Sequence, residues 1–320
     1  MWSNSTRRTA AIAPSSPQGA IEPVLRGSVK RPIAVGGAAR VRARGRRARG
    51  GRGSPTRSRR TARVRRARAS LYSTRMPGHR VDRLAAPEVR ALAAAGAPAL
   101  WAIGSTEQHG GHLVTGFDRF SAEAVCVGAA EHAGIDVALL PPLPYGASDH
   151  WLPLGATWSL RAATLVDVLA DVARSADHAG FRRLVIVNGH AGNIGPGLTA
   201  LAETGAGACR VEFVSYWTLV DGAEARALSP RDEGGVGHAG EVETAIALHL
   251  GGLAVEERLP APAGKALAEG PGSPDPVARL PRPLDESPGG VYGDPGGATE
   301  ELGRLMIEQA IARLAARLTG

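Results

Sequence analysis

Short apolar runs alternate with longer amphipathic segments from about residue 84 to the end of the chain. The runs at 99–103, 137–140, 184–187 and 211–216 have the length of strands rather than of buried helices. Apolar residues follow one another in most of these runs without alternation, as in strands that are covered on both faces of a sheet. Gly, Pro or polar residues bound the runs and predict their ends.

The segments between the runs carry the 3.6-residue apolar period of helices. In 161–179 the apolar positions include Leu165, Leu169 and Val172, and Gly180 predicts the end of the helix. Further helices are predicted at 86–95, 119–133, 196–204, 240–250 and 299–318, with loops at 144–157 and 256–295. Thr299 is the expected N-cap of the last helix.

Strands and helices alternate along the chain, and this order predicts parallel strands joined by helical crossovers. We therefore expect an α/β fold in which two layers of helices cover a mostly parallel central sheet, a three-layer α/β/α arrangement. In such sheets functional sites form beyond the carboxyl ends of the strands. The polar segments that follow the predicted strands are consequently the candidates for a site.

Charge divides the chain into two unlike parts. Residues 1–75 contain 19 Arg and Lys30 against the single acid Glu22, whereas 76–320 hold 18 basic and 29 acidic residues. The first part, rich in Arg, Ala, Gly, Ser and Pro, has too little apolar surface to offset the entropy of ordering it. We predict a disordered arm over 1–75 and one globular domain over 76–320.

Three interpretations of the arm follow from its composition. It fits a basic segment that binds nucleic acid or another anionic surface, and it resembles an Arg-rich organelle transit peptide. The interpretation that we favour is a misplaced start, because the composition turns ordinary at Met76. The acidic balance after Met76 argues against nucleic-acid binding by the globular part.

Cysteine use and hydropathy bear on the compartment. Cys126 and Cys209 are the only two cysteines, which excludes a disulfide framework and favours a reducing cytoplasm. No apolar run approaches the roughly 18 residues that a membrane helix needs. We expect a cytoplasmic protein with neither a membrane span nor a secretory signal peptide.

Four metal-ligand side chains follow the strand predicted at 99–103. Glu107, His109, His112 and Asp118 lie within twelve residues, and carboxylate with imidazole is a ligand set of zinc and similar divalent cations. Residues two apart in extended backbone point the same way, so Glu107 and His109 can face one target. Any one of these residues alone fits an ordinary loop, but the cluster favours a metal site, with His112 orienting the loop by a hydrogen bond.

Two later clusters supply the rest of the predicted site. His190 follows the strand at 184–187 directly and meets the first cluster if the two strands are neighbours. His238 precedes a predicted helix whose first turn holds Glu241 and Glu243. These two carboxylates lie about 200° apart around a regular helix, so only one of them can face the metal.

The three clusters, in this order, resemble the creatininase family of metal-dependent amidohydrolases. The matching segments are Gly-Ser-Thr-Glu-Gln-His-Gly-Gly-His-Leu at 104–113, Asn-Gly-His-Ala-Gly-Asn at 188–193 and His-Ala-Gly-Glu-Val-Glu-Thr at 238–244, with weaker matches at 215–217 and 290–295. The resemblance runs from about Leu84 to the C-terminus. It implies a layered α/β/α subunit, often assembled as a hexamer, with two divalent ions drawn from zinc, manganese and iron.

The resemblance also implies roles for single residues. Glu107 and His190 would bind one ion, His109 would bind the other, and Asp118 would bridge them. His238 matches the catalytic histidine of the family, which passes a proton to the leaving nitrogen. The implied reaction is hydrolysis of a linear or cyclic amide C–N bond by a metal-activated water, with a small-molecule amide as the substrate.

One departure from the family pattern concerns the second metal. In creatininase a further ligand is a glutamate two residues after the equivalent of His190, where this chain has Gly192. This difference argues against creatinine as the substrate. Glu241 is the predicted replacement ligand, and Glu243 is predicted to act in catalysis beside His238.

The loop at 144–157 is predicted to line the substrate pocket. The candidate substrate-binding residues are Tyr145, His150, Trp151 and, at the end of the strand at 211–216, Trp217. Two alternative activities stay open, a peptidase of a mycofactocin-like peptide modification pathway and a formamide deformylase. A nucleic-acid-binding protein that acts through its basic arm is the least favoured alternative.

Overall fold

The computed structural model describes residues 78–204, 207–229, 231, 237–255, 258, 287 and 289–320. The expectations for the arm at 1–75 and for most of the loop at 256–295 lie outside these residues. Within the described part of the chain, no helix has the length and apolar character needed to cross a membrane.

A five-stranded sheet forms the centre of the described domain, in the order β1-β3-β2-β4-β5 with parallel pairing throughout. The strands are β1 (His79–Arg80), β2 (Ala99–Ile103), β3 (Ala138–Leu139), β4 (Arg183–Asn188) and β5 (Arg210–Ser215). The α-helices are α2 (Ala86–Ala94), α3 (Phe117–His132), α4 (Ala162–His178), α5 (Ile194–Glu203), α6 (Gly222–Leu228), α7 (Glu241–Leu250) and α9 (Glu300–Thr319). Short 3₁₀ turns are η1 (Val81–Arg83), η2 (Asp149–Leu154), η3 (Ala191–Asn193), η4 (Tyr216–Leu219) and η6 (Pro295–Gly297).

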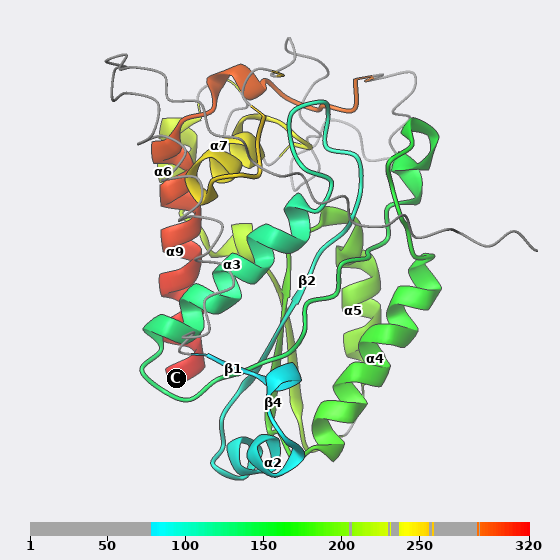
Figure 1. Cartoon of the computed structure of the whole chain (residues 1–320), viewed down its shortest axis with the longest axis vertical. Helices are drawn as coiled ribbons and strands as arrows, with labels where there is room; N and C mark the ends of the chain where they lie inside the picture. The colour runs from blue at the N-terminus through cyan, green and yellow to red at the C-terminus, as the bar shows by residue number, and fades with distance from the viewer. Residues whose placement is uncertain are drawn as a thin grey trace, which may run out of the picture. The chain divides into compact units, whose positions relative to one another are not determined.

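Helices cover both faces of the sheet, which confirms the predicted three-layer α/β/α fold (Figure 1). On one face Leu100 and Ala102 of β2 pack with α3, α7 and α9. On the other face Trp101 and Ile103 pack with α2, α4 and α5. Successive residues of β2 thus enter opposite cores, which is why the strand is apolar at every position.

The strands that carry the predicted site are neighbours and end level with one another. Ile103 of β2 pairs with Asn188 of β4, and Asn188 pairs with Ser215 of β5. The polar segments that follow these strands therefore start from a single edge of the sheet. The prediction that His190 meets Glu107 and His109 required β2 and β4 to be neighbours, and the pairing of these strands confirms that condition.

Helix α9 supports the helix that carries Glu241 and Glu243. Thr299 caps α9 as predicted, since its hydroxyl accepts from Leu302 N at 3.2 Å. Gly303 lies against α7 so closely that a Cβ there would collide with Ala245 O. The backbones of the two helices are therefore in contact, and α9 holds α7 at a defined height above the sheet.

Two helices begin two residues earlier than predicted, and one whole helix was not predicted. Helix α3 begins at Phe117 rather than at 119, so Asp118 belongs to its first turn instead of to a loop. Helix α5 begins at Ile194 rather than at 196. Helix α6 was not predicted, although Asp221 is an N-cap signal and accepts from Ala223 N and Glu224 N.

Candidate metal centre

Two glycines let helix α3 approach the ends of the central strands. Gly104 follows β2 and Gly189 follows β4, and a Cβ on either would collide with the first turn of α3, at Arg119 N and Asp118 O respectively. Because neither residue has a side chain, this turn lies directly against the carboxyl ends of both strands. Asp118 is therefore presented between the two loops that follow them.

One group of ligand atoms combines Glu107, Asp118 and His190. His190 Nδ1 lies 3.3 Å from Glu107 Oε1 and 3.1 Å from Asp118 Oδ2. All three residues are at most 5 % exposed. One ligand atom from each lies within 4.8 Å of the other two, a spacing that could hold a metal ion.

A second group combines His109, Asp118 and Glu243. His109 Nε2 lies 3.0 Å from Asp118 Oδ1 and 3.5 Å from Glu243 Oε2. Asp118 thus offers one oxygen to each of these two groups, and a third group of possible ligands, Glu107, His109 and His238, shares a residue with each of them. The structure brings together four of the five predicted ligands, Glu107, His109, Asp118 and His190.

Backbone carbonyls determine which nitrogen each imidazole presents. A carbonyl oxygen only accepts hydrogen bonds, so the ring nitrogen beside it carries the proton. His190 Nε2 lies 3.1 Å from Ala147 O, and His109 Nδ1 lies 3.4 Å from Glu107 O. The other nitrogens, Nδ1 of His190 and Nε2 of His109, consequently face the carboxylates and are the ones that a cation can bind, an arrangement typical of metal-ligating histidines.

Several of these atoms are buried without a hydrogen-bond partner among the described residues. They are both carboxylate oxygens of Glu107, Oδ2 of Asp118 and Nε2 of His109. An unpaired buried polar group costs roughly 1–3 kcal/mol, and a charged one costs more. Acceptor atoms that converge in this way need positive charge between them, and the mixture of carboxylate oxygen and imidazole nitrogen fits a divalent cation at each group.

The electrostatics of the centre favour positive charge at the same points. Burial would lower the pKa of His109 and of His190, but the carboxylates of Asp118 and Glu107, respectively, raise both pKa values well above the ordinary 6.5. Burial would raise the pKa of Glu107, and charge on His190 instead holds that pKa far below its usual range. The carboxylate of Glu107 therefore stays ionised, whereas burial raises the pKa of Glu243.

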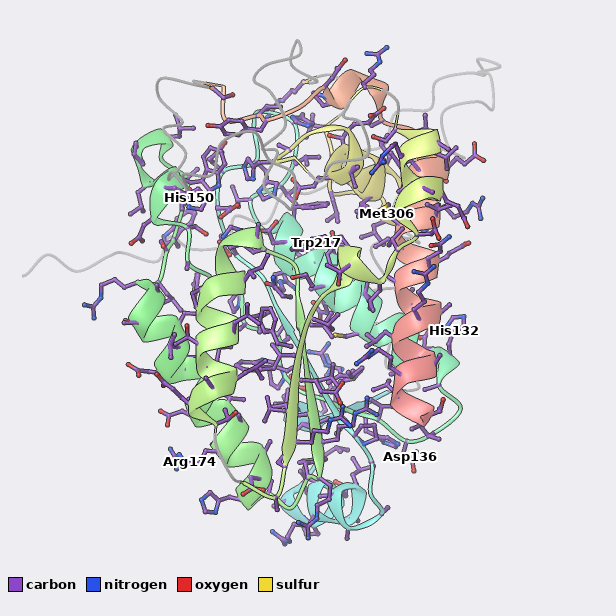
Figure 2. All side chains as sticks on the ribbon, turned by 180° about the vertical axis from the view of Figure 1, so that it is seen from behind. His132, Asp136, His150, Arg174, Trp217 and Met306 are labelled. Atoms are coloured by element: carbon purple, nitrogen blue, oxygen red, sulfur yellow. The ribbon has the colours of Figure 1, made fainter. Side chains whose placement is uncertain are left out.

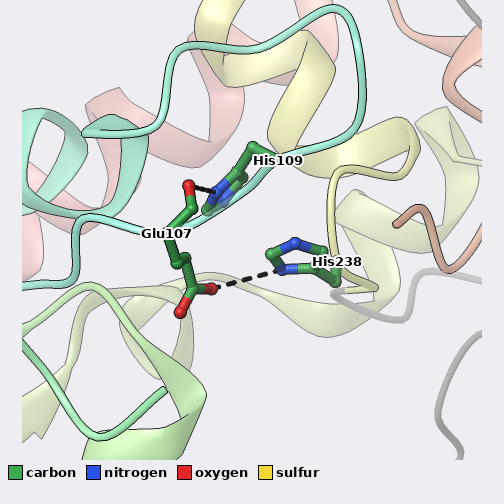
Figure 3. Close-up of side chains that lie close together, drawn as sticks. All are labelled: Glu107, His109 and His238. Atoms are coloured by element: carbon green, nitrogen blue, oxygen red, sulfur yellow. Dashed lines mark hydrogen bonds and ion pairs between the residues drawn. The ribbon is translucent and has the colours of Figure 1, made fainter. Parts of the chain in front are cut away.

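His238 lies beside both groups and is held by Gln108 and Trp151. Its Nε2 donates to Gln108 O at 2.8 Å, and its Nδ1 faces Glu107 Oε1 at 3.5 Å (Figure 3). The ring stacks on Trp151 with 4.1 Å between centroids and lies 4.3 Å from the ring of His109. Burial, followed by the charge of His109, lowers the pKa of His238 to about 3, so a neutral imidazole faces the centre.

A cavity of about 230 Å³ opens over the two ligand groups. Three of the predicted substrate residues, His150, Trp151 and Trp217, line it. Figure 2 shows His150 and Trp217 at the same end of the domain, with Arg174 and Asp136 toward the opposite end. Tyr145, the fourth predicted substrate residue, is 45 % exposed and does not line this cavity.

The two carboxylates at the start of α7 point apart, as the helical geometry predicted. Glu243 faces His109, whereas Glu241 Oε2 accepts from Ser229 Oγ at 2.6 Å. Among the described residues, Glu241 joins none of the groups that could hold a metal. The geometry therefore disagrees with the expectation that Glu241 replaces the ligand absent at Gly192, and it offers Glu243 instead.

Asn193, a residue with no predicted role, connects the loops of the centre. Asn193 donates from Nδ2 to Gly104 O at 3.0 Å and accepts from Ala147 N at 2.9 Å. The second asparagine of the Asn-Gly-His-Ala-Gly-Asn segment was the available signal for this residue. His112 Nε2 lies 3.0 Å from Thr244 Oγ1, which agrees with the hydrogen-bonding role expected for His112.

Comparisons with known proteins identify the family of this chain. The family model described as creatinine amidohydrolase matches residues 82–318. The chain is 34 % identical over 225 residues to the mycofactocin precursor peptide peptidase of Mycobacterium ulcerans (strain Agy99). This alignment covers 67 % of this chain and 82 % of that protein. It is also 34 % identical over 165 residues to the creatinine amidohydrolase of Pseudomonas putida, in an alignment that covers 46 % of this chain and 62 % of that protein.

Solved structures of creatininases share the fold. A crystal structure of creatinine amidohydrolase matches with a TM-score of 0.63 and 30 % identity, over 74 % of this chain and 95 % of that chain. A manganese creatininase structure matches with a TM-score of 0.64 and 29 % identity, over 75 % and 97 % of the two chains. Fold and site together define a hydrolase that acts on amide C–N bonds. The chain belongs to the creatininase family.

Proposed function

We propose that the chain holds two divalent cations and hydrolyses an amide C–N bond in the cavity above them. One cation would lie among Glu107, Asp118 and His190, and the other among His109, Asp118 and Glu243. The observation that carries this proposal is that unpaired buried atoms, the oxygens of Glu107, Oδ2 of Asp118 and Nε2 of His109, belong to these two groups of ligand atoms. Zinc, manganese and iron all suit this donor set, and solved relatives include a Zn–Zn form and a manganese form of creatininase.

The residues of the chain have separate tasks in this mechanism. Bound divalent cations supply Lewis acidity, which acidifies water and polarises an amide carbonyl. Glu107 and Asp118 provide the negative charge that retains the cations. His238 accepts a proton at its bare Nδ1 and delivers it to the leaving nitrogen. Trp151, stacked on the ring of His238, keeps that nitrogen facing the centre.

The substrate class that we favour is a precursor peptide rather than creatinine. Alignment length does not separate the two substrate classes, because the chain matches 82 % of the M. ulcerans peptidase and 95 % of a solved creatinine amidohydrolase. The choice rests on Gly192, because any side chain there would collide with Ala147 O. This chain therefore has no room for the additional glutamate that creatininase carries. No observation on the described residues favours a formamide deformylase or a nucleic-acid-binding protein.

We further propose that the enzyme is a cytoplasmic homo-oligomer. Both cysteines are free and buried, which fits a reducing compartment. A hexamer follows from the resemblance to creatininases alone, and size-exclusion chromatography with light scattering would test it.

Metal analysis of the purified full chain, followed by an amide screen, tests the proposed activity. We expect two divalent ions per chain. We also expect the protein to hydrolyse short peptides, and a chelator should abolish this hydrolysis until metal is added back. Creatinine and small formamides complete the screen. Turnover of creatinine without cleavage of any peptide would contradict the substrate class, and amide hydrolysis at full rate by chelated protein would contradict the metal centre itself.

A further inference from the structure

We propose that Ala147, Ser148 and Gly192 hold His190 in the single tautomer that can bind a cation. We call these three residues the His190 clamp. The inference rests on the proposed metal centre and identifies positioning residues for it. The clamp acts on the side of the imidazole ring that points away from the carboxylates.

Two oxygen atoms of the clamp meet the far nitrogen of His190. Nε2 lies 3.1 Å from Ala147 O and 3.1 Å from Ser148 Oγ. Because Ala147 O can only accept, Nε2 carries a proton, and Nδ1, which faces Asp118, is the nitrogen left for a cation to bind. In the other tautomer Nε2 would turn a lone pair toward a carbonyl oxygen, and the proton on Nδ1 would occupy the position of the cation.

The hydroxyl of Ser148 is itself held from behind. It lies 2.6 Å from Ser105 Oγ, and both serines are completely buried. Ser105 follows Gly104 at the end of β2, so this pair of hydroxyls ties the clamp to the edge of the sheet. A buried polar network in which each member has its partner defines one geometry and resists rearrangement.

Gly192 provides the space in which the clamp closes. A Cβ at position 192 would lie 2.5 Å from His190 Nε2 and would also collide with Ala147 O. The backbone of Gly192 is not in the left-handed region, so the position needs a glycine for space and not for conformation. The absence of a side chain at 192 and the approach of Ala147 and Ser148 to His190 are therefore two parts of one arrangement.

The test compares two clamp variants with two matched controls in the full chain. Ser148→Ala removes the hydroxyl, and Gly192→Ala forces the carbonyl and the ring apart. Ser175→Ala is the serine control, because its hydroxyl bonds to Asp171 O on the surface of α4. Gly195→Ala is the glycine control, because a Cβ there meets nothing within 4 Å.

Two measurements are made on each variant. Competition with a chelating dye gives the zinc dissociation constant. Long-range ¹H–¹⁵N correlation spectra of zinc-loaded protein with labelled histidine show which ring nitrogen of His190 carries the proton. Mutation of residues that orient a ligating histidine typically weakens metal binding about 10- to 100-fold. We expect losses of that size in both clamp variants, together with a displaced or broadened His190 Nε2–H signal, and parental behaviour in both controls.

Unchanged zinc affinity and an unchanged Nε2–H signal in both clamp variants would overturn the clamp, even with a lower melting temperature, because such a result would show a packing role alone. A parent chain that binds no zinc, manganese or iron would overturn the metal centre and the clamp with it. Metal binding by the parent chain therefore distinguishes a failure of the metal centre from a failure of the clamp.

Discussion

Glu243 Oε2 lies 3.5 Å from His109 Nε2, which brings a side chain of α7 into a centre otherwise built at the ends of β2 and β4. Glu241, two residues earlier on the same helix, bonds to Ser229 instead. Glu241 is therefore a matched control for Glu243, because both residues are buried glutamates in the same helical turn.

Replacement of these glutamates should separate a ligand from a structural acid. We expect Glu243→Gln to lose one of the two bound ions, because a neutral amide is a weaker ligand than a carboxylate, and to lower amide hydrolysis by about 100-fold or more, since Lewis-acid assistance is worth several kcal/mol. Glu241→Gln should keep both ions. Plasma mass spectrometry of dialysed protein measures the metal content, and two ions in Glu243→Gln would contradict the assignment.

His238 should affect turnover without affecting metal content. Loss of a residue that transfers a proton in the transition state typically lowers the rate about 10²- to 10⁴-fold. We therefore expect His238→Ala to show a fall of that size in kcat while it retains two ions per chain. Loss of an ion in this variant would show that Nδ1 of His238 is a ligand, and unchanged kcat would remove His238 from the mechanism.

Metal binding should release protons. The raised pKa values of His109 and His190 mean that these imidazoles hold protons near neutral pH until a cation displaces them. We expect zinc affinity to increase between pH 6 and pH 8, and calorimetry in buffers of different ionisation enthalpy to detect the released protons. A zinc affinity that is the same across this range would contradict the raised pKa values.

The same histidines determine how the stability of chelated protein depends on pH. A histidine whose pKa is raised by folding stabilises the fold below the unfolded value of about 6.5, and this contribution is lost as pH rises through the folded pKa. His112 and His238, with pKa values lowered to about 4 and about 3, are neutral in both states well above pH 6.5. The melting temperature of chelated protein should therefore fall as pH rises above 6.5, and a His109→Ala, His190→Ala double variant should lose that slope.

The contact between α7 and α9 makes Gly303 sensitive to substitution. An alanine within a helix is ordinarily about 0.5–1 kcal/mol more favourable than glycine, but a Cβ at Gly303 would collide with Ala245 O. We expect Gly303→Ala to reduce the free energy of unfolding by about 1–3 kcal/mol, the usual cost of overpacking, as measured in urea. The control Gly195→Ala should be neutral or stabilising, and equal stability of the two variants would contradict the close approach.

The fold followed largely from local patterns. Strand β2 has its predicted bounds because Pro98 and Gly104 enclose an apolar run that is buried on both sides. The start of α3 was placed two residues late because nothing local marks Phe117 as helical. Its first turn is held by close contacts with Gly104 and Gly189, and these contacts form only when the strands are assembled.

The choice of ligands depended on tertiary structure in the same way. Spacing alone showed that Glu241 and Glu243 could not both face the metal, but the rotation of α7 relative to His109 decides which of them does. The pocket residues divide similarly. Trp217 lies where a strand end places it, whereas Tyr145 precedes η2 and points outward, a direction that no local pattern indicates.

Anomalous diffraction from crystals of the full chain loaded with zinc would show directly whether two cations bind at Asp118. We expect two peaks per chain about 3.5–4 Å apart, one beside His190 Nδ1 and the other beside His109 Nε2, with Asp118 in contact with both. A single peak, or peaks that leave Asp118 without a metal neighbour, would contradict the proposed two-metal centre.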